Sequence, residues 1–149
     1  MRKLSPFSIK ISRMINAPLP FVYSWWTDFR EDDWKITGQR RKITIHERTR
    51  NRFIMSVKYQ GQGKTATAAR IVTLKPPDAW HLDWIGDEHD ETGDYKLTRV
   101  GRNRTKLTVI FKVKPKATSW ANKVKRQRII ENVWNKYIAA MESAALRIR

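Results

Sequence analysis

The chain contains few side chains that could carry catalytic chemistry. Its imidazoles are His46, His81 and His89, and strand alternation predicts outward, surface positions for His46 and His81. The lack of cysteine excludes a thiolate nucleophile, a disulfide and a cysteine zinc site. The sequence also lacks a Gly-x-Ser-x-Gly elbow, a phosphate-binding loop and a His-Glu-x-x-His motif. We therefore predict no catalytic residue, no metal ligand and no cofactor, and the sequence favours a binding protein over an enzyme.

One acidic run, Asp87-Glu88-His89-Asp90-Glu91, has residue types that bind hard cations. In an extended segment Asp87, His89 and Glu91 would share one face. The run nevertheless lacks the spacing and the glycine of an EF-hand loop. We interpret it as part of a solvated hairpin tip over about residues 87–93, which attracts the chain's own basic residues.

The charge balance is strongly basic, with 31 Lys and Arg against 14 Asp and Glu and a formal net charge of +17. If the basic residues converge on one face, they would attract a nucleic acid or an acidic partner, and an exposed Trp120 could stack on a base. The alternative is a surface that only keeps the protein in solution. Many of the basic residues fall in three groups: Arg40, Arg41, Lys42, Arg48, Arg50 and Arg52; Arg99, Arg102, Arg104 and Lys106; and Lys123, Lys125, Arg126 and Arg128.

Length and composition predict one domain over residues 1–149, of which 40% are hydrophobic. No stretch is long and apolar enough to span a membrane, and the N-terminus lacks the apolar region of a signal peptide, so we expect a cytoplasmic protein. Alternating apolar residues predict a first strand over 7–15. The segment 16–20, Asn-Ala-Pro-Leu-Pro, then predicts a helix that ends near Thr27, and a second short helix should follow before Gly38.

The central part of the chain predicts about five or six strands that form consecutive hairpins. The clearest alternation is that of Leu107, Val109, Phe111 and Val113, which predicts one buried face for this strand. Proline and glycine punctuate the segment, because proline cannot donate to a strand ladder and glycine favours turns. The turns are expected at residues 49–52, 61–63, 76–78, 87–93 and 101–104.

A long C-terminal helix is predicted from about Trp120 nearly to Arg149, capped by Thr118 or Ser119. At about 1.5 Å per residue it would be roughly 40 Å long. Its apolar stripe needs a covering surface, and only the sheet is large enough. The stripe consists of Ile130, Val133, Trp134, Tyr137, Ile138, Met141, Ala145 and Ile148.

The order of these elements resembles the helix-grip fold of the START-like, or Bet v 1-like, superfamily (SRPBCC). The stretch 15–28, Ile-Asn-Ala-Pro-Leu-Pro-Phe-Val-Tyr-Ser-Trp-Trp-Thr-Asp, with Trp34 soon after, is similar to the family's opening pattern. The resemblance implies an α+β domain in which a curved antiparallel sheet wraps a long C-terminal helix, with two short helices after the first strand. Relatives include lipid carriers, polyketide cyclases and aromatases, plant hormone receptors and co-chaperone domains, so the resemblance implies a cavity rather than a particular reaction.

A sheet that curves around a helix leaves an apolar gap wherever the facing side chains do not fill it. The alternative is that the facing side chains form an ordinary core. The phenols among them would need hydrogen-bond partners when buried, which suits a polar group on a ligand. We predict ligand contacts from Met55, Val57, Tyr59, Trp84, Tyr95, Phe111, Trp134, Tyr137, Ile138 and Met141.

These observations predict a protein that binds a hydrophobic small molecule or lipid between the sheet and the C-terminal helix. Because Lys123 to Arg128 begin that helix, a cavity mouth there would be positive and would favour a ligand with an anionic group. Two alternatives remain open. One is a polyketide cyclase- or aromatase-like enzyme that uses the same cavity, and the other is a protein that binds a nucleic acid or an acidic partner through its basic surface.

Overall fold

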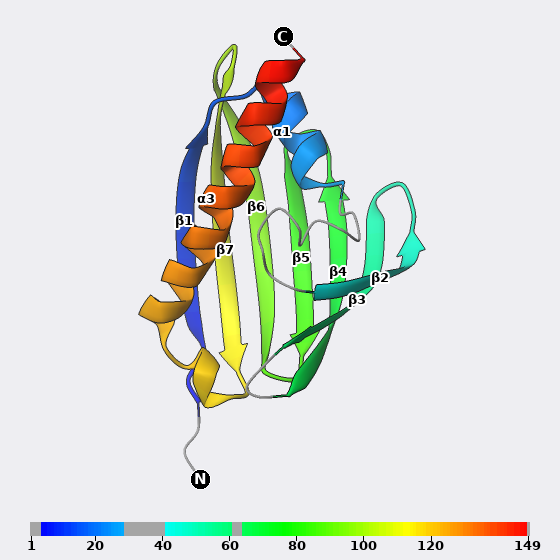
Figure 1. Cartoon of the computed structure of the whole chain (residues 1–149), viewed down its shortest axis with the longest axis vertical. Helices are drawn as coiled ribbons and strands as arrows, with labels where there is room; N and C mark the ends of the chain where they lie inside the picture. The colour runs from blue at the N-terminus through cyan, green and yellow to red at the C-terminus, as the bar shows by residue number, and fades with distance from the viewer. Residues whose placement is uncertain (1–3, 29–40, 61–63, 149) are drawn as a thin grey trace.

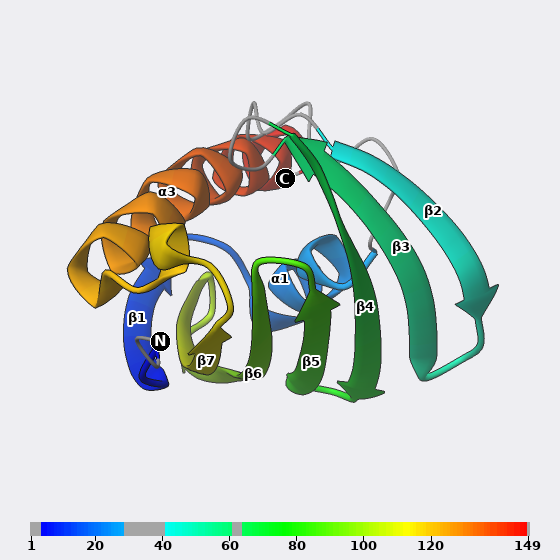
Figure 2. The same cartoon turned by 90° about the horizontal axis from the view of Figure 1, so that it is seen from below.

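A single antiparallel sheet curves around a long helix in the computed structural model, which describes residues 4–28, 41–60 and 64–148. Figure 2 shows helices α1 and α3 on the concave side of the sheet. Neighbouring strands follow the order β1-β7-β6-β5-β4-β3-β2. The strands are β1 (Phe7–Ile15), β2 (Arg41–Arg48), β3 (Arg52–Gln60), β4 (Thr65–Lys75), β5 (Ala79–Gly86), β6 (His89–Gly101) and β7 (Arg104–Pro115).

The sheet is built from consecutive hairpins, as the sequence predicted. The strands from β2 to β7 pair antiparallel in sequence order. Strand β1 forms the edge beyond β7 and pairs with it from Phe7↔Val113 to Ile15↔Thr105. Turns fall at residues 49–51, 76–78 and 102–103, where asparagine and proline favour them. The expected turn at 61–63 and the expected second short helix before Gly38 lie outside the described residues.

The expected polar tip over residues 87–93 is wrong in extent. Only Asp87 and Glu88 separate β5 from β6, and β6 begins at His89. His89 is buried, with 2% of its surface exposed. The long strand forms because its residues continue the ladder of β7 as far as His89↔Pro115, which outweighs the weak strand preference of acidic residues.

The helices begin and end close to their predicted positions, with corrections at the caps. Helix α1 (Leu19–Trp26) has Pro18 at its N-cap and no side-chain cap. The chain forms a 3-10 turn, η1 (Thr118–Trp120), before α3 (Lys123–Arg147). Asn122, rather than Thr118 or Ser119, caps α3, because its side chain accepts a hydrogen bond from the Lys125 amide at 3.0 Å.

Helix α3 covers the concave face with its predicted stripe, except at the last residue. Trp134, Ile138, Met141 and Ala145 are buried against the sheet. Ile148 is 72% exposed, so its assignment to the stripe was wrong, because α3 ends before it at Arg147. In the part of the chain that the structure describes, no helix combines the length and hydropathy that crossing a membrane requires.

The described residues of the three basic groups lie on separate segments: along β2 and its turn to β3, around the turn between β6 and β7, and at the start of α3. In Figure 1 the tip between β2 and β3 lies at the right, the turn between β6 and β7 at the top, and the start of α3 at the lower left. Trp120, expected to be exposed, is partly buried against the core.

Candidate functional site

A cavity of about 540 Å³ lies between the concave face of the sheet, α1, η1 and the N-terminal half of α3. This volume is within the range of about 300–1,000 Å³ that is typical of small-molecule sites. Nine of the described residues that line the cavity have aromatic rings. They are Trp26, Tyr59, Trp80, Trp84, Tyr95, Phe111, Trp120, Trp134 and Tyr137.

The sheet positions the floor of the cavity through cross-strand pairing. Trp80 on β5 is opposite Tyr95 on β6, and their rings stack with centroids 4.7 Å apart. Tyr95 meets Phe111 on β7 edge to face at 5.7 Å. Gly93 makes this close approach possible, because a Cβ atom there would lie 3.0 Å from Phe111 Cε1 and 3.1 Å from Tyr95 Cε2.

The two helices supply the opposite wall. Trp26, at the end of α1, packs edge to face on Trp134 and Tyr137, with ring centroids 5.2 and 4.9 Å apart. The Tyr137 hydroxyl donates a hydrogen bond to the Trp25 carbonyl at 3.2 Å. This bond ties α3 to α1 beside the cavity, and it satisfies one of the phenols predicted to need a partner.

A stack of rings closes the cavity beside η1. The His89 ring stacks on the rings of Trp84 and Trp120, with centroid distances of 5.6 and 3.4 Å. Arg126 of α3 lies over the Trp120 ring at 4.0 Å, and its Nε donates to the Ser119 carbonyl at 3.0 Å. Arg126 therefore fixes η1 to the first turn of α3 and holds Trp120 in place.

Charged side chains gather at the end of the cavity formed by β2, β4 and β6. The guanidinium Cζ atoms of Arg41 and Arg70 lie 5.6 and 5.4 Å from the ring centre of Trp84. Burial and, after it, the charge of Arg70 lower the pKa of Arg41 to about 10, although Glu91 opposes both effects. Burial and the Glu88 carboxylate raise the pKa of Tyr59. At neutral pH Arg41 is thus a cation and Tyr59 is a neutral phenol.

One buried imidazole faces this charged end. His89 Nε2 lies 3.7 Å from Glu91 Oε1, and among the described residues its Nδ1 has no hydrogen-bond partner. The hydroxyl of Ser119, which also lines the cavity, has none there either. These atoms are available to a polar group of a bound molecule.

Several side chains predicted as ligand contacts line the cavity, and others do not. Met55 and Val57 are fully buried in the core, as are Ile138 and Met141 to within a few per cent. The residues of α3 that line the cavity end at Tyr137, so the C-terminal half of the helix packs directly on the sheet. The predicted residues that do line it are Tyr59, Trp84, Tyr95, Phe111, Trp134 and Tyr137.

The polar residues that line the cavity were not predicted, except for the basic residues at the start of α3. Of those basic residues, Arg126 alone lines the cavity. For His89 and Glu91 a signal existed, because counting back by twos from Tyr95 places both on the inward face. For Arg41 the same count from Ile43 gave a signal, because both side chains share one face of the strand. For Arg70, which precedes the apolar pair Ile71 and Val72, alternation alone gave none.

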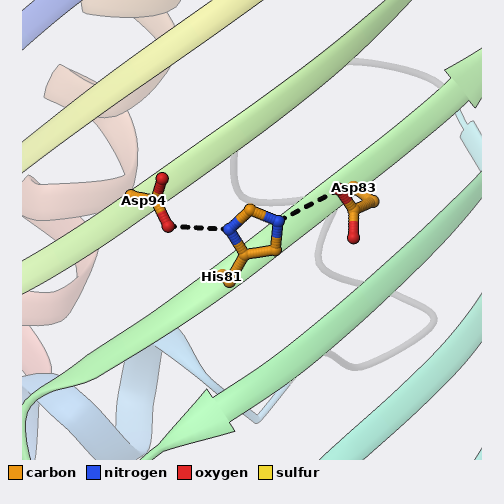
Figure 3. A network of polar contacts seen from close by, with 3 residues as sticks. All are labelled: His81, Asp83 and Asp94. Atoms are coloured by element: carbon orange, nitrogen blue, oxygen red, sulfur yellow. Dashed lines mark hydrogen bonds and ion pairs between the residues drawn. The ribbon is translucent and has the colours of Figure 1, made fainter.

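The other histidines lie away from the cavity. Figure 3 shows His81 between Asp94 and Asp83, with Nδ1 2.7 Å from Asp94 Oδ1 and Nε2 3.0 Å from Asp83 Oδ1. Burial lowers the pKa of His81, but the hydrogen bonds to both carboxylates outweigh it and raise the pKa above 6.5. His46 is exposed and contacts Ser56. Neither imidazole lines the cavity.

Comparison with known proteins identifies the architecture. The sequence matches no family model and no curated protein. Among solved structures, the Zhui aromatase/cyclase from Streptomyces sp. R1128 is 14% identical, with 97% of each chain covered and a TM-score of 0.71. A START superfamily protein from Mycobacterium smegmatis is 14% identical over 95% of this chain and 99% of that one, with a TM-score of 0.70. Ara h 8.0201 is 14% identical over 96% and 99%, with a TM-score of 0.72.

Proposed function

We propose that this chain, which has the helix-grip fold of START-like and Bet v 1-like proteins, binds a hydrophobic small molecule between its sheet and α3. The observation that carries the proposal is the cavity of about 540 Å³ with walls of aromatic rings. Such walls favour flat, apolar molecules, because offset and edge-to-face ring contacts add to the gain from burying apolar surface.

The charges of the cavity favour a ligand with an anionic group. Among the described residues three arginines and two glutamates line it, so these side chains together carry a net positive charge. In a partly desolvated space this charge attracts an anion more strongly than it would in water. A lipid or other apolar molecule that ends in an anionic group therefore fits better than a neutral one.

Binding of a neutral fluorescent probe, 1-aminoanthracene, tests the apolar cavity alone. Val133 of α3 lines the cavity, and we expect Val133→Trp to fill it and weaken probe binding at least tenfold. Val124 lies on the same helix and is 67% exposed, so Val124→Trp is the matched control and should bind like the unchanged protein. No binding by the unchanged protein, or equal binding by both variants, would contradict the proposal.

A second candidate function, cyclisation of a polyketide-like chain, is supported by the buried His89 with Glu91 beside it. An imidazole oriented by a carboxylate is suited to removing a proton from carbon next to a carbonyl. The test is turnover of a synthetic polyketone thioester, followed by mass spectrometry. His89→Gln should abolish the product and His46→Gln, on the outside, should not. If the unchanged protein yields no cyclised product, the binding function stands alone.

A further inference from the structure

We propose that Arg41 is the anion-binding group of this cavity and that the ligand is an aromatic carboxylate. This inference rests on the proposed function, because it assumes that the cavity holds an apolar small molecule. It adds which residue recognises the ligand and which chemical class is recognised.

Arg41 occupies an unusual position for an arginine. It is the first residue of β2, opposite Tyr59 of β3, and it lines the cavity. Its guanidinium lies over the Trp84 ring, yet among the described residues it makes no hydrogen bond and no ion pair. A guanidinium has five N–H donors, so this group requires acceptors that a ligand entering the cavity would supply.

The neighbouring charges leave Arg41 without a dedicated counter-ion. Arg70, which is opposite Trp84 in the sheet, adds a second guanidinium at the same indole. Glu91, on the other side of Trp84, attracts Arg41, but its carboxylate also lies 3.7 Å from His89. Glu91 is thus shared between Arg41 and His89, and an anion of the ligand would relieve the repulsion of Arg41 by Arg70.

The second glutamate of the cavity, Glu88, acts on Tyr59 and Arg126. Glu88 raises the pKa of Tyr59 through its charge, after the larger effect of burial, and it opposes the lowering of the pKa of Arg126 by burial. Glu88 therefore acts on Tyr59, which lies opposite Arg41 in the sheet, and on Arg126 of α3.

The geometry at Trp84 favours a carboxylate attached to a ring. A guanidinium is a planar fork that matches a carboxylate through two parallel hydrogen bonds. A flat ring system that packs against Trp84 and the stacked pair Trp80 and Tyr95 would carry its carboxylate toward the guanidinium beside the indole. Apolar rings and charge recognition then occupy adjoining parts of one cavity.

The test compares ligands that differ only in charge. Tryptophan quenching or calorimetry measures binding of 2-naphthoate and of its neutral isostere 2-naphthamide. We expect the unchanged protein to bind the carboxylate at least tenfold more tightly than the amide. Arg41→Gln should remove this preference while retaining amide binding, and Arg41→Lys, which keeps the charge without the fork, should retain part of it. Arg99→Gln, an exposed arginine of β6 outside the cavity, is the matched control and should keep the full preference.

Each outcome separates the two proposals. If neither naphthalene compound binds, the proposed function fails. If the amide binds as tightly as the carboxylate, or if Arg41→Gln weakens both equally, the cavity stands and the anion site at Arg41 is refuted. Tighter binding of 2-naphthyl phosphate than of 2-naphthoate would contradict the carboxylate class. The comparison of ligands on the unchanged protein decides the charge preference even if Arg41→Gln does not fold.

Discussion

Replacing Gly93 by alanine is expected to destabilise the protein because the floor of the cavity has no room for a methyl group. The new Cβ would lie 3.0 and 3.1 Å from two carbons of the Phe111 ring and 3.1 Å from Tyr95 Cε2. Ordinary contacts begin near 3.4 Å, so both rings must move by a few tenths of an ångström. These rings already contact each other edge to face, and neither can move without disturbing its partner.

The magnitude follows from two opposing effects. Forcing one extra methyl group into a packed region costs about 1–3 kcal/mol, whereas alanine reduces the freedom of the unfolded chain and returns about 0.4–1 kcal/mol. The net loss is about 1 kcal/mol, or roughly 2–4 °C in melting temperature for a domain of this size.

Urea unfolding followed by tryptophan fluorescence measures this loss, and Gly101→Ala is its control. A Cβ at Gly101 meets nothing within 4 Å, so that variant has the same entropic gain without the steric cost and should be slightly stabilised. The difference between the two variants isolates the contact with the rings, at about 1–3 kcal/mol. Equal free energies of unfolding for both alanine variants would refute the reasoning, and Phe111→Leu in the Gly93→Ala background should restore part of the loss.

Other features of the fold lead to three further predictions. Because the folded-state pKa of His81 is raised above 6.5, its charge stabilises the protein fully below pH 6.5, and this stabilisation is lost as the pH rises through the raised pKa. Asp94→Asn should reduce that loss, as urea titrations between about pH 5 and 9 would reveal; an unchanged pH profile would count against the ion pair. Thr105→Val removes a buried hydrogen bond of 2.8 Å to a backbone carbonyl and should cost about 1–2 kcal/mol in thermal or urea unfolding, and a neutral result would indicate that water replaces it. Asn122→Ala removes the cap of α3 and should cost about 0.5–2 kcal/mol, which hydrogen exchange would locate in the first turn of the helix; uniform exchange changes would contradict that location.

The overall fold was predictable because its signals are local. Alternation at Leu107 to Val113, the helical stripe that begins at Ile130, and the proline and glycine turns each depend on residues close in sequence. Pairing these segments in sequence order then yields the curved sheet. The pairing of β1 with β7 was not predicted, because it joins segments that lie far apart in the sequence.

The polar half of the cavity was not predictable in the same way. Arg70 lies in a threonine- and alanine-rich stretch whose alternation is weak, and its approach to Trp84 depends on the register between β4 and β5. Trp120 lies between the end of a strand and a polar segment, so neither strand alternation nor helical spacing predicts its contact with His89. Such positions depend on side chains that meet only after the sheet and α3 have packed.

The pairing of β1 with β7 has a consequence for the protein during its synthesis. Phe7 finds its partner only in Val113, and at a ribosomal rate of about 5–20 residues per second the first strand waits roughly 5–20 s for that partner to emerge. Throughout this time its apolar face, with Ile9 and Ile11, is exposed to other nascent chains. Lys10 and Arg13 interrupt the strand with positive charge, as do gatekeeper residues that hinder edge-to-edge aggregation. The same basic residues that add to the net charge thus protect the chain while its sheet is incomplete.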